Sequence, residues 1–157
     1  MSTGQWVLLA YRLPREPSTP RIALWRALRR LGAAQLLDGL VALPADARTR
    51  EQLEWLADSV LEAGGQATVW IAQPGSRAQE RAIAAPMQAE IDREYAAVAG
   101  KAADAHQTAA GARKRTLSRL RRELRRVRRR DYFSAPRGAD ARAAVQALAR
   151  SLEETPA

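Results

Sequence analysis

The sequence predicts an α+β protein in which a half of order βαββαβ precedes an all-helical, arginine-rich half. Four short apolar runs, each followed by proline or glycine, alternate with two amphipathic segments in residues 1–75. Residues 76–157 contain no strand-like run and hold apolar residues at helical spacing. We therefore expect an α+β domain at 1–75 and a helical extension at 76–157, with a basic helix at 112–130.

The first strand and helix are delimited by prolines and a glycine. Residues 5–12 form a compact apolar run that ends before Pro14 and predicts a buried strand. Ser18 or Thr19 is suited to cap the following helix, because Pro20 then falls in its first turn. Gly32 is suited to end that helix. Its expected core face comprises Ile22, Leu24, Trp25, Leu28 and Leu31.

The next segments predict a hairpin, a second helix and a final strand. Residues 33–37 and 40–43 are typical of short strands joined by the turn dipeptide Asp38-Gly39. Asp46 is suited to cap a helix that ends at Gly64, and residues 67–72 supply the fourth strand. This order is the ferredoxin-like arrangement, in which we expect both helices to cover one face of a four-stranded antiparallel sheet. The expected core face of the second helix comprises Leu53, Trp55, Leu56, Val60 and Leu61.

Three narrow apolar seams predict the helices of the second half. Such seams are typical of helices that pack pairwise or against a second chain. Residues 100–111, rich in Ala, Asp, Gln and Thr, predict a bend or loop between the first two helices. The seams are Ile83-Met87-Ile91-Tyr95-Val98, Leu117-Leu120-Leu124-Val127 and Ala141-Val145-Leu148-Leu152.

The net charge of +9 is concentrated in one helix. Residues 113–130 hold eleven bases and one acid, Glu123, so this segment carries +10 and the rest of the chain −1. A localised positive field of this kind favours a polyanion as partner, and arginine can contact both phosphates and guanine edges. We expect DNA to be that partner. The predicted nucleic-acid-binding residues are Arg113, Lys114, Arg115, Arg119, Arg122, Arg125, Arg126, Arg129 and Arg130.

The basic helix is also compatible with roles that involve no nucleic acid. Its arginines could pair within the chain, or the helix could dock on an acidic protein or membrane surface. Five acids on the neighbouring segment cannot neutralise eleven bases, so a cationic surface is expected in any case. These acids are Glu80, Glu90, Asp92, Glu94 and Asp104.

The sequence carries no enzyme signature, and we predict neither catalysis nor a cofactor. There is no cysteine, which excludes disulfides, thiol catalysis and cysteine-ligated metals and fits a cytoplasmic location. His106 is the only histidine and lies in a polar segment, so we expect no metal site. No glycine-rich phosphate loop, signal peptide or membrane-spanning run is present.

The aromatic residues are interpreted as structural. Tyr132 and Phe133 directly follow the basic run, and we expect them to anchor the end of that helix. The tryptophans lie in predicted strands and helices, where core packing is favoured over stacking on bases. They are Trp6, Trp25, Trp55 and Trp70.

Several runs together match the pattern of one known family over most of the chain: Trp6–Pro14, Pro17-Ser18, Arg21, Trp25-Arg26, Leu28, Leu31–Ala33, Glu54–Leu56, Glu62–Thr68, Asp92–Tyr95 and Asp131–Pro136. On these runs the chain resembles the N-terminal domain of ChrB, the chromate-resistance regulator family. The resemblance implies a transcriptional regulator of a chromate-efflux operon that loses DNA affinity when chromate binds. The first half is also similar to a domain of the phenylacetate repressor PaaX and to small CRISPR adaptation endonucleases. The first strand ends in Tyr11-Arg12-Leu13, without a carboxylate, which argues against a nuclease.

A chromate site requires several converging cationic or N–H donors, because a dianion must be desolvated and held. The best set that lies close in sequence is Arg12, Arg15 and Arg21, with hydroxyls from Ser18 and Thr19. The alternative is that these arginines lie on the outer surface of an amphipathic helix. We therefore predict a DNA-binding, chromate-responsive regulator that acts as a homodimer. A non-catalytic protein-interaction module whose basic helix docks on an acidic partner is the alternative.

Overall fold

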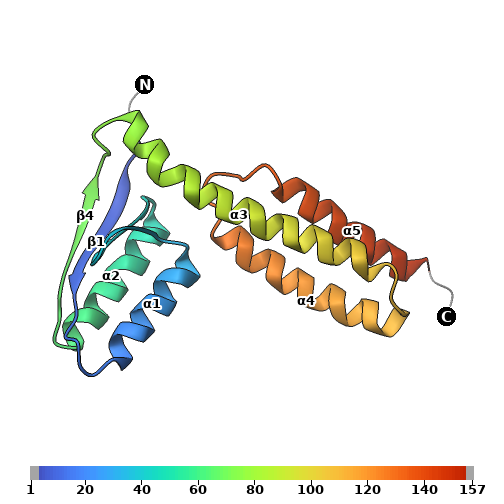
Figure 1. The fold of residues 1–157 in the computed structure, drawn as a ribbon, viewed down its shortest axis with the longest axis horizontal. Coiled ribbons are helices and arrows are strands. Elements are labelled where there is room, and N and C mark those ends of the chain that lie inside the picture. Colours follow the sequence, from blue (N-terminus) through green and yellow to red (C-terminus); the bar gives the residue numbers. More distant parts are fainter. Residues whose placement is uncertain (1–3, 155–157) are drawn as a thin grey trace. The chain divides into compact units, whose positions relative to one another are not determined.

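The computed structural model describes residues 4–154, and the chain divides between Met87 and Gln88 into two compact units (Figure 1). The first unit holds the sheet, two helices and the start of a long third helix, α3 (Arg77–Ala105). The second unit holds the rest of α3 and two further helices. The last strand ends close to the expected boundary at residue 75, but α3 belongs to both units, so the division falls inside a helix.

The first unit has the expected α+β order around a four-stranded antiparallel sheet. The strand order is β2-β3-β1-β4, with the first strand in the middle. Leu9 of that strand lies opposite Val41 on one side and Val69 on the other. The elements are β1 (Trp6–Arg12), α1 (Thr19–Leu31), β2 (Ala34–Leu37), β3 (Leu40–Pro44), α2 (Ala47–Glu62) and β4 (Gln66–Ala72).

The end of α1 and the start of α2 are fixed by the residues that the sequence indicated, whereas the Ser18 hydroxyl does not cap α1. Gly32 follows α1 with a left-handed φ of 70°, a conformation that glycine adopts without steric cost. At the start of α2, the carboxylate of Asp46 accepts a 2.7 Å hydrogen bond from the Thr49 N–H, while the Thr49 hydroxyl bonds the Asp46 N–H at 3.0 Å. The same hydroxyl donates to the Pro44 carbonyl at 2.7 Å, which ties α2 to the end of β3.

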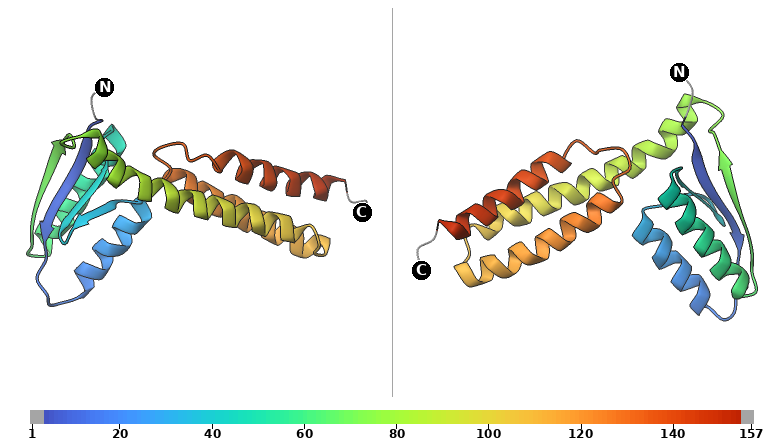
Figure 2. Two further views of the ribbon diagram at one scale, coloured as in Figure 1. Left: turned by 45° about the horizontal axis from the view of Figure 1, so that its top comes forward. Right: turned by 180° about the vertical axis from the view of Figure 1, so that it is seen from behind.

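One face of the sheet is buried, and both helices lie on the same side of the sheet (Figure 2). Val7 and Leu9 of β1 are fully buried, as are their β3 neighbours Leu43 and Val41. The helices contribute buried leucines, an alanine and a valine at spacings of about one or two turns, so the expected layered core is confirmed. These residues are Leu24 and Leu28 of α1 and Leu53, Ala57 and Val60 of α2.

The expected placement of the tryptophans in the core is wrong for three of the four. Trp25 follows the buried Leu24 and therefore turns about 100° away from it around α1. Trp55 stands two residues after the buried Leu53, on the opposite side of α2, and Ile22 and Leu61 are also exposed. On β4 the side chains alternate, so Trp70 lies on the face opposite to that of Val69. The exposed fractions are 3% for Trp6, 57% for Trp25, 63% for Trp55 and 57% for Trp70.

The second unit is built from α3, α4 (Ala110–Arg129) and α5 (Gly138–Glu153) around one apolar core. The three seams supply most of that core, as expected from their spacing, but Ile83 and Met87 of the first seam belong to the first unit and are not part of it. The predicted bend at 100–111 is too long, because Ala102 and Ala105 are buried and α3 continues to Ala105. Within residues 4–154, no helix is long and apolar enough to cross a membrane. The core residues include Ile91, Tyr95 and Val98 of α3, Leu117, Leu120 and Val127 of α4, and Ala141, Val145 and Leu148 of α5.

Candidate nucleic-acid interface

The apolar seam of α4 determines which of its basic side chains reach solvent. Leu117, Leu120 and Val127 are buried, and Leu124 packs partly against the same core. Because these positions occupy one side of a helix of 3.6 residues per turn, the arginines between them are directed outward or to the flanks. The hydrophobic contacts thus hold a strongly charged helix in place without neutralising it.

Two ion pairs join α4 to α3. Arg130 donates two hydrogen bonds of 2.6 Å to the two oxygens of Glu94, a bidentate geometry that guanidinium and carboxylate favour. Hydrogen bonding to Glu94 raises the pKa of Arg130 above its ordinary value, against the opposing effect of burial. Glu123, the one acid among residues 113–130, accepts a 2.8 Å bond from Lys101. The charge of Glu123 is therefore engaged with α3.

Arg113 attaches the first turn of α4 to the segment before the helix and to α5. Its guanidinium donates to the carbonyl of Thr108 at 3.1 Å and to the hydroxyl of Ser151 at 3.3 Å. The side chain is half-buried. Arg113 and Arg130, both predicted to contact nucleic acid, thus bind protein groups near the two ends of the helix.

A hydrogen-bonded turn fixes the segment that follows α4. The Tyr95 hydroxyl donates to one oxygen of Asp131 at 2.9 Å, and the Ala135 N–H donates to the other at 2.9 Å. Burial, the bond to Asp131 and the charge of Asp131 raise the pKa of Tyr95 to about 12. Tyr132 and Phe133 lie half-buried in this turn.

Most of the remaining basic side chains of α4 face solvent. Arg115, Arg119, Arg122 and Arg126 follow one another at spacings of 4, 3 and 4, so they form one continuous row about 16 Å long. We call this row, together with the other exposed bases of α4, the basic face of α4. Lys114, Arg121 and Arg128 lie more than about 100° around the helix from the row, on the flank next to the apolar seam. Within residues 4–154, eight of its side chains make no hydrogen bond or ion pair: Lys114, Arg115, Arg119, Arg121, Arg122, Arg125, Arg126 and Arg128.

The acids of α3 neutralise little of this face. Among the five considered from the sequence, Glu94 pairs with α4. Glu80 accepts hydrogen bonds from the Trp6 indole at 3.0 Å and from a backbone N–H, and Asp92 accepts one from the Arg137 N–H at 3.0 Å. Glu90 pairs with Arg93 on α3 itself. A surface of unneutralised guanidinium groups remains, and it can take phosphate oxygens as hydrogen-bond acceptors.

The basic face contains two residues that the sequence interpretation left out. Arg121 and Arg128 are exposed, as are the predicted Lys114, Arg125 and Arg129. The signal was available in the sequence, because Lys114, Arg121 and Arg128 recur every seven residues and therefore share one side of the helix.

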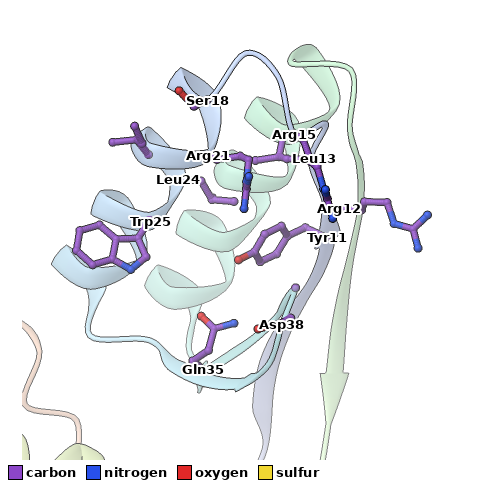
Figure 3. A pocket seen from close by; sticks show the side chains of 12 residues that line it. Tyr11, Arg12, Leu13, Arg15, Ser18, Arg21, Leu24, Trp25, Gln35 and Asp38 are labelled. Carbon is purple, nitrogen blue, oxygen red and sulfur yellow. The ribbon is translucent and has the colours of Figure 1, made fainter.

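The three arginines predicted to hold an oxyanion lie around a cavity of about 790 Å³ in the first unit (Figure 3). Arg21 extends from α1 toward Tyr11, and Arg15 lies beside the end of β1. Arg12 lies at the edge of the cavity, with its guanidinium directed away from Arg15 and Arg21. Alternation along β1 explains this, because Tyr11 faces the helices and Arg12 therefore faces the opposite side. Residues 4–154 contain no cluster of three metal-ligating side chains.

Comparison with known proteins relates this chain to one family. Residues 21–156 match the family model described as Protein ChrB, N-terminal. The chain is also similar to Protein ChrB of Cupriavidus metallidurans, with 33% identity over 147 residues that make up 90% of this chain and 44% of the relative. The chain therefore spans less than half the length of that relative. No solved structure matches.

Proposed function

The chain belongs to the family of ChrB N-terminal domains, and on that premise we propose that it is a DNA-binding transcriptional regulator associated with chromate resistance. The observation that supports this proposal is the basic face of α4, where eight exposed bases have no protein partner within residues 4–154. The proposal includes a non-catalytic, cytoplasmic protein that acts as a homodimer.

The basic face suits the backbone of a nucleic acid. Duplex DNA carries about one negative charge per 1.7 Å of its axis, so a rigid row of guanidinium groups some 16 Å long can meet several phosphates at once. Helix α4 is rigid because its apolar seam is buried and its ends are attached through Arg113 and Arg130. Each guanidinium brings donors that match two phosphate oxygens, and each contact releases counterions.

The response to chromate is proposed from the family resemblance. In this proposal the oxyanion lowers the affinity of the protein for the DNA upstream of a chromate-resistance operon. Arg15 and Arg21 both line one cavity of the first unit, and the guanidinium of Arg12 is directed away from them. The Asp38 carboxylate lines the same cavity and repels a dianion, so the proposal places chromate at no particular residues.

The test is fluorescence anisotropy of a labelled duplex from upstream of the gene against a scrambled duplex of equal length. The series covers several salt concentrations, with and without chromate, and heparin serves as a competitor. We expect preference for the upstream duplex, a steep loss of affinity with salt and release of the upstream duplex by chromate. The stoichiometry at saturation reports whether two chains bind each duplex.

Equal binding to both duplexes, unchanged by chromate, would contradict the regulator proposal. The basic face would then bind polyanions without selection, and docking on an acidic protein would become the better account of it. Sulfate at the same ionic strength is the matched control for chromate, because it is also a tetrahedral dianion. Release by both anions would show a response to salt or to tetrahedral dianions in general, without selectivity for chromate.

A further inference from the structure

One cavity of the first unit lies between α1 and the hairpin of β2 and β3, and its lining differs from what a bare oxyanion needs. A tetrahedral oxyanion occupies roughly the volume of two water molecules, or about 60 Å³. The cavity volume of about 790 Å³ is in the range that encloses organic ligands. It is also open to solvent. It therefore has room for an occupant larger than chromate or phosphate.

We propose that this cavity binds a nucleoside phosphate, with the phosphate at Arg15 and Arg21 and the base beside Trp25. The proposal goes beyond DNA binding by α4 and is independent of it, because the two sites belong to different units. Three groups of side chains support it.

The first group is cationic. Arg15 and Arg21 line the cavity, and neither side chain makes an ion pair or hydrogen bond within residues 4–154. Ser18 lies at the same end, and its hydroxyl does not cap α1 although the residue occupies the N-cap position. Two guanidinium groups and a hydroxyl can together donate enough hydrogen bonds to hold a phosphate.

The second group is apolar and aromatic. Trp25 is 57% exposed although it lines the cavity, and Ile22 stands one turn before it on the same side of α1. The guanidinium of Arg29 lies 5.0 Å from the centre of the Trp25 ring, which restricts the orientation of the indole. A large, exposed indole at a cationic cavity is costly in water, and an aromatic base stacked on it would remove that surface from solvent.

The third group is polar and includes an acid. The Tyr11 hydroxyl is directed into the cavity, and Gln35 and Asp38 line its lower part (Figure 3). The Gln35 amide N–H already bonds the Leu37 carbonyl at 2.5 Å, so its oxygen is left as an acceptor. The Asp38 carboxylate repels a bare dianion, but it can accept hydrogen bonds from ribose hydroxyls or from the amino group of a base. A cavity with cations at one end and hydrogen-bond acceptors at the other suits a nucleoside phosphate better than inorganic phosphate, which offers no sugar or base to the acceptors.

The wall that carries these acceptors is fixed to the sheet. The Tyr11 N–H donates to the Gly39 carbonyl at 2.8 Å, and a Cβ on Gly39 would lie 2.4 Å from the Tyr11 carbonyl oxygen. Gly39 also has a left-handed φ of 76°. The turn therefore requires glycine, and the hairpin stays against β1.

The test is a titration of the full chain with the fluorescent nucleotide mant-ADP, followed by anisotropy, with unlabelled ADP, inorganic phosphate and chromate as competitors. We expect saturable binding that ADP displaces and that phosphate or chromate at the same concentration does not. Arg21→Gln and Trp25→Ala should each weaken binding about tenfold, since each removes one charge-assisted or stacking contact. Both side chains are exposed, so the fold is preserved, which far-UV circular dichroism checks.

Two control variants separate this site from general attraction of anions. Arg26→Gln removes the same charge from the same helix at an exposed position outside the cavity, and it should change affinity less than twofold. A variant with Arg119, Arg122 and Arg126 changed to Gln should bind mant-ADP as the parent chain does. Absence of saturable binding, equal effects of Arg26→Gln and Arg21→Gln, or displacement by chromate as readily as by ADP would each overturn the proposal. If the α4 variant loses DNA binding but still binds mant-ADP, the nucleotide-binding proposal is supported as independent of DNA binding.

Discussion

Removal of three arginines from the basic face of α4 gives the sharpest test of how this protein would hold DNA. The perturbation is the combined change Arg119→Gln, Arg122→Gln and Arg126→Gln. These side chains are exposed and make no hydrogen bond or ion pair within residues 4–154. Their replacement therefore removes charge and leaves the apolar seam of α4 unchanged. Because like charges at this spacing repel, the variant should fold at least as stably as the parent chain.

The magnitude follows from counterion release. Each phosphate contact contributes about 0.9 to the slope of log K against log salt, so three contacts account for about 2.7. At 0.1 M salt each lost contact lowers affinity roughly eightfold, and three together lower it about 500-fold. When extrapolated to 1 M salt, the DNA affinities of the variant and the parent chain should become equal, because the electrostatic contribution to binding vanishes there.

The measurement is the anisotropy of a labelled duplex at five or more salt concentrations for each protein. The matched control is the combined change Arg77→Gln, Arg81→Gln and Arg150→Gln, which removes the same net charge from exposed positions outside α4. We expect the control to keep its slope within about 0.5 of the parent value, since its arginines contact no phosphate in the proposed complex.

A slope that falls equally in both variants would refute the reasoning. Such a result would mean that DNA senses the total charge of the chain, and the position of the arginines on α4 would have no special role. A variant that loses affinity with an unchanged slope would also contradict it, since the lost interaction would then not be with phosphates.

Further predictions concern the bonds that hold the helices in place. Tyr95→Phe removes the bond to Asp131 and should lower the free energy of unfolding by about 1–2 kcal/mol in urea titration, and an unchanged midpoint would contradict this. Because the pKa of Tyr95 is raised to about 12, the stabilisation from its neutral hydroxyl is present below pH 10. This stabilisation is lost as the pH rises from 10 through 12. In that range the free energy of unfolding of Tyr95→Phe should change less with pH than that of the parent chain. Glu94→Gln leaves Arg130 half-buried without its ion pair and should cost about 1–3 kcal/mol in the same titration, while Glu94→Asp should cost less. Thr49→Val removes the hydroxyl bonds at the start of α2, from the Asp46 N–H and to the Pro44 carbonyl, and should lower the free energy of unfolding by about 1–2 kcal/mol. A loss of less than about 0.5 kcal/mol would contradict the stabilising role of this hydroxyl.

The secondary structure was predictable because its signals are local. Proline and glycine positions, the Asp46 cap and apolar spacing depend on a few neighbouring residues, and each acts in the same way in any fold. The one long error, at residues 100–111, came from composition. Alanine and polar residues were interpreted as a loop, although buried Ala102 and Ala105 continue the apolar seam of α3 at helical spacing.

The exposure of the tryptophans was not predictable in the same way, because it depends on which face of each element meets its neighbours. In α1 both Leu24 and Trp25 are apolar, and hydropathy alone cannot choose between them. The choice is made by packing against the sheet, which buries Leu24 and Leu28 and turns Trp25 toward the cavity. A large apolar residue on a wide helical face was interpreted as core when it was the lining of a pocket.

The site residues also divide into features that local sequence predicts and features that depend on tertiary contacts. That α4 is basic was evident from the sequence, but Arg113 and Arg130 engage protein groups through contacts 38 and 36 residues away in the chain. Such pairs depend on tertiary structure and leave no local signal. The direction of Arg12 was accessible, since alternation along a strand with Tyr11 facing the helices puts Arg12 on the other side.

The charge distribution along α4 has an energetic consequence that links its structure to the proposed function. Arginines spaced three and four residues apart repel one another, so an isolated helix of this sequence would be destabilised. Three features offset that repulsion: a buried apolar seam, the bonds of Arg113 near one end and the ion pair of Arg130 with Glu94 at the other. All of them lie on the inner side or at the ends, where they leave the outer row unneutralised. Stability is thus supplied by groups that do not compete for the basic face, and a bound polyanion would relieve the remaining repulsion without displacing a single internal contact.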